Sequence, residues 1–146
     1  MNDSLFLTLA EVLEIHKDQI VRYGGHPEIR DYDLLRSSAA APQATWDGLY
    51  LNSNLFEMAA AYIYYVCQDH PFIDGNKRTA LASGLVFLEL NGITIEDPDG
   101  ILYMYIMNLA SGKMSKNELK SILKNLHTDF LKKYEESSVN VGGKVK

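Results

Sequence analysis

Ten consecutive residues near the middle of the chain carry the side chains best suited to chemistry. They are His70-Pro71-Phe72-Ile73-Asp74-Gly75-Asn76-Lys77-Arg78-Thr79. An imidazole can be neutral near pH 7 and can then take a proton as a general base. A carboxylate is the ligand that Mg²⁺ most often combines with substrate phosphates and water. The spacing therefore predicts a catalytic base, His70, and a metal-binding acid, Asp74, in one loop.

The second half of this loop has the features of an anion site. Residues 80–88 are almost entirely apolar, so a buried helix is expected to begin within the loop. The N–H groups of a helix's first turn lack intrahelical partners, and the helix dipole is positive there. We therefore predict that a nucleotide's phosphates bind to the segment formed by Gly75, Asn76, Lys77 and Arg78. The expected chemistry is transfer of a phosphorus group to a hydroxyl, driven by positioning and charge neutralisation.

Helical periodicity covers most of the remaining chain. It predicts helices over residues 8–21, 31–41, 54–69, 76–90, 97–112 and 115–134. Three of these begin with capping-box pairs: Thr8 with Glu11, Asn54 with Glu57, and Ser115 with Glu118. The helix over 76–90 has few polar residues after the loop and is expected to lie at the centre. The fold class is an all-α bundle of about six helices around this buried central helix.

The region between the second and third predicted helices is irregular. Asp47-Gly48 is typical of a tight hairpin turn, so a short flap or hairpin is expected there. We place a target-docking flap over residues 42–54. Two alternatives remain for Trp46, which either belongs to this binding loop or fills the edge of the core. His16 is expected to be a helix histidine bonded to a neighbour.

Bulk composition limits the function classes. The chain has 146 residues, which fits one domain over residues 1–134, followed by a polar tail over 135–146 that we expect to be disordered. A net charge of −5 argues against direct nucleic-acid binding. No apolar run approaches the ~20 residues of a membrane span. A single cysteine, Cys67, permits no internal disulfide and reads as a small buried hydrophobe, so a cytoplasmic protein is expected.

The run from His70 to Leu81 resembles the signature of the Fic/Doc (Fido) family. Within that family it resembles the death-on-curing branch, whose loop reads His-x-Phe-x-Asp-x-Asn-Lys-Arg-Thr-Ala. Arg22-Tyr23-Gly24-Gly25 is also similar to that branch, and the resemblance spans roughly residues 5–130. It implies a Fido-type bundle that uses ATP and Mg²⁺ to modify a protein hydroxyl. By position, His70 resembles the catalytic base, Asp74 the metal-associated acid, and residues 75–78 the phosphate-binding segment.

Two departures from the wider Fic pattern bear on which phosphorus group moves. Lys77 stands where the AMP-transferring members have a glycine, and Leu81 stands where they have a second arginine. In the death-on-curing branch these changes accompany phosphoryl transfer. The resemblance therefore implies a toxin of a toxin–antitoxin module that transfers a phosphoryl group from ATP to a Ser or Thr hydroxyl of a target protein, such as a translation factor.

Two alternative functions remain open at this point. One is a Fic-type protein nucleotidyltransferase that transfers AMP, and the other is a non-catalytic helical binding module. Control is a separate question, because many Fic proteins carry an inhibitory Ser/Thr-x-x-x-Glu-Gly/Asn helix. The nearest match, residues 53–58, ends in Met58 instead. We therefore expect inhibition by a separate antitoxin protein that folds on binding.

Overall fold

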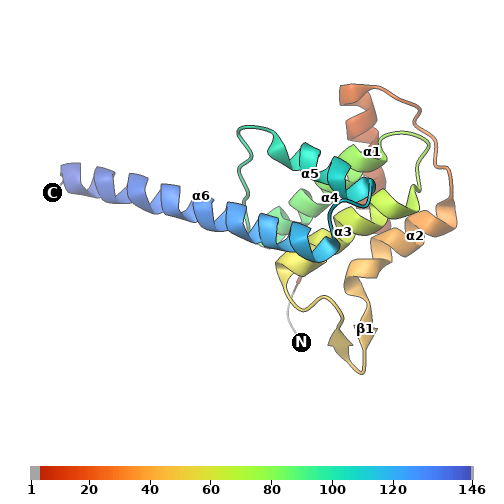
Figure 1. Cartoon of the computed structure of the whole chain (residues 1–146), viewed down its shortest axis with the longest axis horizontal. Coiled ribbons are helices and arrows are strands. Elements are labelled where there is room, and N and C mark those ends of the chain that lie inside the picture. The colour runs from red at the N-terminus through yellow and green to blue at the C-terminus, as the bar shows by residue number, and fades with distance from the viewer. Residues whose placement is uncertain (1–3, 146) are drawn as a thin grey trace.

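Six α-helices and one short hairpin make up the part of the chain that the computed structural model describes. This part comprises residues 4–145, with side chains described for residues 4–137. The elements are α1 (Leu9–Tyr23), α2 (Tyr32–Ala40), a 3-10 turn (Ala41–Gln43), β1 (Thr45–Trp46), β2 (Leu49–Tyr50), α3 (Leu55–Asp69), α4 (Asn76–Leu90), α5 (Ile101–Ala110) and α6 (Lys116–Val145) (Figure 1). The all-α bundle with a short hairpin predicted from the sequence is confirmed.

Capping side chains fix where α1, α3 and α6 begin. In α1 and α6 the cap hydroxyl and the glutamate bond each other's backbone N–H groups, which is the full capping box. In α3 the Asn54 side chain accepts the N–H of Glu57 at 2.9 Å. The Glu57 carboxylate accepts the backbone N–H of Ser53 at 2.9 Å and not that of Asn54. Each cap satisfies N–H groups that the helix itself leaves open.

The start of α5 differs from the prediction. The periodicity predicts a helix from residue 97, but α5 begins at Ile101. Gly100 has a positive φ of 66°, which no right-handed helix can contain, so residues 97–100 form a turn instead. The Asp97 carboxylate still accepts the N–H groups of Ile101 at 2.9 Å and Leu102 at 3.1 Å. Asp97 therefore caps α5 from four residues before its first helical residue.

The bundle is centred on α3 and α4, which pack against each other along their lengths. α3 also contacts α2, α5 and α6, whereas α4 contacts α1 and α5. α3 is thus the more central of the two helices, a position that the sequence analysis gives to α4. The tyrosines of α3 make this helix look less buried in the sequence than it is. Tyr62 is fully buried, and its hydroxyl accepts the backbone N–H of Leu7 at 2.9 Å. α4 in turn leaves Leu85 and Val86 only partly buried.

Gly84 allows the closest approach between these two helices. A Cβ added there would lie 2.6 Å from Cγ1 of Ile63 and 3.1 Å from the carbonyl oxygen of Ala59. We expect Gly84→Ala to destabilise the fold by about 1–2 kcal/mol in urea unfolding, since overpacking costs about 1–3 kcal/mol and the gain in helix propensity offsets up to ~1. In an Ile63→Ala background the same change should destabilise much less, because the two nearest Ile63 atoms are gone and only the 3.1 Å approach to Ala59 remains. A destabilisation of equal size in both backgrounds would contradict this packing.

The predicted hairpin is present. β1 and β2 pair antiparallel, and the turn residues Asp47 and Gly48 have φ values of 53° and 79°, as a type I′ turn requires. Trp46 is 77% exposed, so its assignment to the core edge is wrong. The hairpin precedes the N-terminus of α3, and the 15 residues of that helix, about 22 Å in length, separate it from His70. The hairpin projects from the end of the bundle opposite the loop (Figure 1). Docking of a target by this flap stays a prediction.

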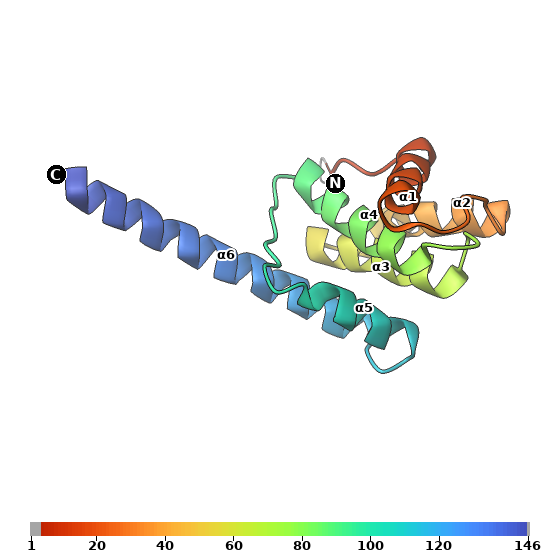
Figure 2. The same ribbon diagram turned by 90° about the horizontal axis from the view of Figure 1, so that it is seen from above.

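The last helix is longer than expected. Residues 135–146 are predicted to form a disordered tail, but α6 continues through residues 135–145 to Val145, and residue 146 lies outside the described part. Lengthening an existing helix needs no new nucleus and gains one hydrogen bond per residue, which favours continuation. α6 packs beside α5 over its first half and then runs outward alone (Figure 2). Within the described residues, no helix combines the length and apolar character that a membrane span needs.

Candidate active site

The loop between α3 and α4 places His70 at an exposed bend. His70 is the C-cap of α3 and has a left-handed backbone, with φ 46° and ψ 55°. Pro71 prevents the helix from continuing, as the sequence predicts. Gly75, with φ 80°, is the N-cap of α4 and has no side chain to cover the first-turn N–H groups. The imidazole and the open N-terminus of α4 therefore belong to the same loop, with the anion-binding end of the helix uncapped.

A cavity of about 490 Å³ opens over this loop. Its walls come from four parts of the chain: the end of α1 with the glycines after it, the loop, the first turn of α4, and α5. The lining residues are Gln19, Tyr23, Gly24, Gly25, His70, Ile73, Asp74, Gly75, Asn76, Lys77, Arg78 and Tyr103. All six residues that the sequence analysis assigns to catalysis, metal binding or phosphate binding lie in this one cavity. They are therefore close enough together to act on one bound molecule.

Arg30 holds the loop from outside. Its Nε donates to the carbonyl oxygen of His70 at 2.6 Å and its Nη2 to that of Asp69 at 2.8 Å. The backbone next to Arg30 also pairs with the loop, through an isolated antiparallel bridge between Ile29 and Phe72. A cation at the C-terminus of α3 satisfies carbonyl groups that have no helical partner and complements the dipole. Arg30 thus fixes the backbone from which the His70 imidazole projects.

The Asn76 side chain closes the loop from inside. Its Oδ1 accepts the backbone N–H of Phe72 at 3.0 Å, and its Nδ2 donates to the carbonyl oxygen of Phe72 at 2.8 Å. Asn76 belongs to the segment predicted to bind phosphate, but both the oxygen and the nitrogen of its amide are engaged with Phe72. Phe72 itself is 1% exposed and anchors the loop in the core. The side chain of Asn76 is therefore a brace for the loop, and its backbone N–H stays at the helix N-terminus.

His16 supports the same loop from α1. Its ring stacks on Phe72 with centroids 3.7 Å apart, and its Nε2–H donates to the carbonyl oxygen of Asp74 at 2.8 Å. A carbonyl only accepts, so Nε2 must carry the proton. The ring is 3% exposed, and this burial lowers the pKa of His16 because the charged form loses hydration. The expectation of a helix histidine bonded to a neighbour is confirmed.

The lowered pKa of His16 makes stability fall in mildly acidic solution. Unfolded His16 titrates near 6.5, whereas the folded residue titrates lower, so between those values the unfolded chain binds more protons. The free energy of unfolding should therefore decrease as the pH falls below about 6.5, and His16 should add no pH dependence above it. Urea unfolding from pH 7.5 to 5.5 measures this. His16→Gln keeps an N–H donor and does not titrate, so a slope unchanged in that variant would contradict the assignment.

Asp74 presents a carboxylate to the cavity. Its Oδ2 accepts the backbone N–H of His26 at 2.7 Å, which ties the loop to the turn after α1. The described residues contain no cluster of three or more His, Cys, Asp or Glu side chains able to enclose a metal. A single carboxylate beside this cavity of about 490 Å³ fits Mg²⁺, which binds through one or two carboxylates and takes its other ligands from phosphates and water. Asp74 is therefore the residue that could hold this ion.

Two cations follow at the start of α4. The Arg78 guanidinium lies over two tyrosine rings, 4.1 Å from the centroid of Tyr23 and 4.8 Å from that of Tyr103. Such stacking leaves the edge of the guanidinium plane, with its N–H donors, free to bind an anion.

The Lys77 charge is close enough to Cys67 to oppose the effect of burial on the thiol, but burial dominates and raises the pKa of Cys67 to about 12. Cys67 is thus a neutral core residue, as expected.

Comparison with known proteins identifies the family to which the chain belongs. Residues 6–88 match the model of the Fic/DOC family, which is more than half of the chain and includes the whole loop. The chain belongs to the Fic/Doc family. It is 40% identical over 75 residues to "Toxin Doc" of Mycolicibacterium smegmatis, a match that covers 51% of this chain and 58% of that relative. It is 31% identical over 119 residues to "Protein kinase doc" of Escherichia phage P1, covering 80% of this chain and 91% of that protein.

Some parts of the site lie beyond what the Fic/Doc loop signature predicts. Arg30, Tyr23 and Tyr103 position the loop or Arg78, and the sequence analysis assigns none of them to the site individually. The match to the family model ends at residue 88, so Tyr103 lies outside it. Neither spacing nor a motif marks Tyr103, because its role depends on how α5 packs over α4. Leu81 is partly buried against the core and supplies no charge to the cavity.

Proposed function

We propose that this Fic/Doc protein is a toxin that transfers the γ-phosphoryl group of ATP to a Ser or Thr hydroxyl of a target protein. The observation that carries the proposal is the joint lining of one cavity by His70, Asp74 and the uncapped N-terminus of α4 with Lys77 and Arg78. The relatives support it by name, one being "Toxin Doc" and the other "Protein kinase doc". A target in translation would place the protein's action in the cytoplasm.

In the proposed reaction His70 acts as the general base. Its neutral imidazole removes the proton of the target hydroxyl, and the hydroxyl oxygen forms a bond to the γ-phosphorus of ATP. The bond between that phosphorus and the oxygen bridging to the β-phosphate breaks, and ADP leaves with the bonding electron pair. The proton on His70 then passes to solvent. The left-handed backbone and the Arg30 hydrogen bonds hold the imidazole at the edge of the cavity for this step.

The phosphate groups are held by charges that are already in place. First-turn N–H groups of α4, the Lys77 ammonium and the stacked Arg78 guanidinium would bind the phosphate oxygens. Mg²⁺, held by Asp74, would neutralise phosphate charge when bound. Because Arg78 already contacts two tyrosine rings before ATP arrives, little ordering is needed on binding. Positioning and electrostatics supply most of the catalysis in phosphoryl transfer.

Transfer of AMP is the second candidate. It uses the same fold and the same loop, but the nucleotide must lie with its α-phosphate at the hydroxyl. Lys77 occupies the position where a small glycine leaves room in the AMP-transferring relatives, and Leu81 provides no second arginine. These two residues favour transfer of the γ-phosphoryl group. The third candidate is a binding module without catalysis. It gives no reason why His70 and Asp74 line the same cavity.

Inhibition would come from a separate antitoxin protein. Residues 53–58 are the nearest match to the inhibitory helix of other Fic proteins, and they lie at the start of α3, at the other end of that helix from His70. Glu57 there bonds Ser53 and Asn54 and caps the helix. The purified chain alone should therefore be active. Activity that appeared only after shortening this chain would contradict control by a second protein.

Labelled ATP in cell lysate tests the proposal. The protein is incubated with lysate and ATP labelled at either the α- or the γ-phosphate, and labelled proteins are separated by electrophoresis. Label from the γ-position alone is expected. Label from the α-position would support AMP transfer and contradict the proposal. If neither label is transferred and His70→Asn still arrests growth as the unchanged protein does, the binding module is supported instead.

A further inference from the structure

A lysine-rich face of α6 lies outside the cavity that His70 lines. Residues 113–124 contain Lys113, Lys116, Lys120 and Lys124 but one carboxylate, Glu118, in a chain whose net charge is −5. Lys116, Lys120 and Lys124 follow at i, i+4 and i+8, so they stand in a row on one side of the helix. Like charges at this spacing destabilise a helix unless an opposite charge compensates them. The structure gives these three lysines no ion pair with any residue that it describes.

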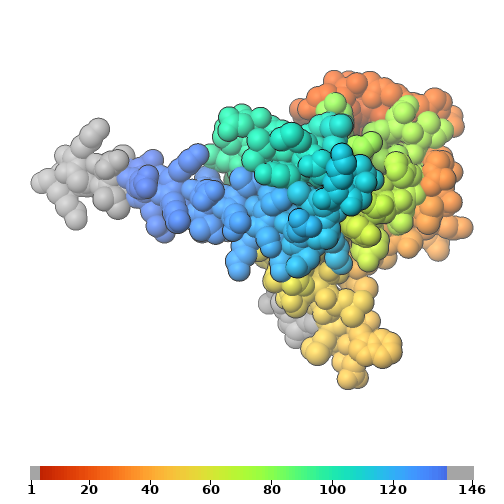
Figure 3. Space-filling view, viewed as in Figure 1, coloured from red at the N-terminus to blue at the C-terminus, as the bar shows by residue number. Residues whose placement is uncertain are grey.

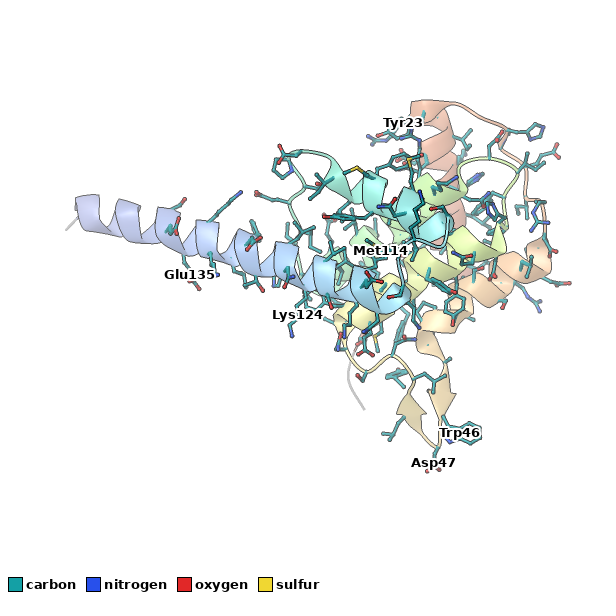
Figure 4. All side chains as sticks on the ribbon, in the orientation of Figure 1. Tyr23, Trp46, Asp47, Met114, Lys124 and Glu135 are labelled. Atoms are coloured by element: carbon teal, nitrogen blue, oxygen red, sulfur yellow. The ribbon has the colours of Figure 1, made fainter. Side chains whose placement is uncertain are left out.

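This row borders a groove between α6 and the start of α3. Two cavities of about 170 and 450 Å³ lie along it, and Lys120 lines both. Lys116 lines the first and Lys124 the second, while Leu51 and Phe56 contribute apolar surface. The space-filling view shows the start of α3, in yellow, directly below α6, in blue (Figure 3). Lys124 points to the same side of the molecule as Trp46 of the hairpin and away from Tyr23 (Figure 4).

Few groups in the groove already neutralise these charges. Glu57 is the one carboxylate among the described residues that line the two cavities, and it accepts hydrogen bonds from the Ser53 backbone, the Ser53 hydroxyl and the Asn54 amide. Lys116 donates to Asn52 at 3.4 Å, a neutral partner, and lies 5.5 Å from the Tyr65 ring. The partial positive charge of the α3 N-terminus adds to the same field. The groove is thus a cationic surface with an apolar floor.

We propose that this groove, bounded by Lys116, Lys120 and Lys124 and floored by Phe56 and Leu51, binds an acidic amphipathic helix of another protein. Carboxylates spaced i, i+4 on such a helix repeat every 6 Å, which is the rise between successive lysines of the row. Its apolar face would cover Phe56 and Leu51, of which Leu51 is 63% exposed. A long nucleic acid fits less well, because the rest of this chain is acidic and would repel it.

Binding of a designed peptide tests this surface without ATP and without His70, so the result is independent of the proposed reaction. The probe is a labelled three-turn helix with glutamates at i, i+4 and i+8 and leucines on the adjoining face. A peptide of the same composition with scrambled order is the control, and anisotropy with the full chain is the readout. The ordered peptide should bind more tightly than the scrambled one, and its affinity should fall as salt rises.

Two matched variants complete the test. Lys120→Gln with Lys124→Gln should weaken binding about tenfold, because each exposed ion pair contributes a few-fold in affinity. Lys133→Gln, on the same helix but outside the groove, should bind as the unchanged protein does. The double variant should keep its thermal midpoint, which separates lost binding from lost folding. Equal binding of both peptides, full binding by the double variant, or tighter lysine-dependent binding of an RNA oligonucleotide would each overturn the proposal.

Discussion

Replacement of His70 by Asn is expected to lower the rate of group transfer by about 10²–10⁴-fold and to leave the fold intact. The rate falls because a positioned general base contributes a factor of this size. The fold survives because the His70 side chain is exposed and asparagine tolerates the left-handed backbone found there, with φ 46°. The measurement is the initial rate of labelling of the modified lysate protein, with growth arrest as a second readout.

His70→Ala serves as the comparison for this variant. Alanine also removes the base but adds backbone strain at a positive φ, so it should lose stability as well as activity. If His70→Asn and His70→Ala lose the same activity, and only His70→Ala lowers the free energy of unfolding, the activity belongs to the imidazole. Transfer at the full rate by His70→Asn would show that another group takes the proton, and the mechanism proposed here would be wrong.

Replacement of Asp74 is expected to have the second large effect, a loss of about 10²-fold or more in transfer rate. A metal ion contributes several kcal/mol of charge stabilisation, and 1.36 kcal/mol corresponds to a factor of ten. Asp74→Asn removes the charge but keeps an oxygen that can accept the N–H of His26. Rates measured across a Mg²⁺ titration should then show weaker dependence on the ion, together with weaker Mg²⁺-dependent ATP binding.

Asp74→Ala separates the two tasks of this side chain. It loses the bond to His26 as well as the charge, so the connection between the loop and the turn after α1 should loosen. Transfer should be lost to a similar degree in both variants, while the unfolding free energy should fall mainly in Asp74→Ala. If Asp74→Asn retained full activity and the original Mg²⁺ dependence, Asp74 would not be the residue that holds the ion.

Local sequence signals predict most of the helices and the positions of the loop residues. Capping pairs such as Thr8 with Glu11 act over three residues, so the start of a helix is visible in the sequence itself. The bend at His70-Pro71 and the turn at Asp47-Gly48 likewise depend on residues next to one another. For this reason these elements could be predicted without knowledge of the tertiary packing.

The residues that the sequence does not reveal are those whose role depends on contacts between distant segments. Arg30 reaches carbonyl groups 39 and 40 positions away, and Tyr103 meets Arg78 only because α5 packs over α4. For Asn76 the sequence suggests a site role that its side chain does not have. Its type and position suggest phosphate binding, but the loop must close on Phe72, and the amide is used for that. Chemical type alone cannot decide between these two uses of an amide.

The mass of the modified target protein tests the central claim most directly. The protein that becomes labelled in lysate is purified, incubated with this chain and unlabelled ATP, and analysed by mass spectrometry before and after proteolysis. The loop described here, with Lys77 in place and Leu81 uncharged, predicts a gain of one phosphoryl group on a single Ser or Thr, absent with His70→Asn. A gain of one AMP group at that hydroxyl would contradict it.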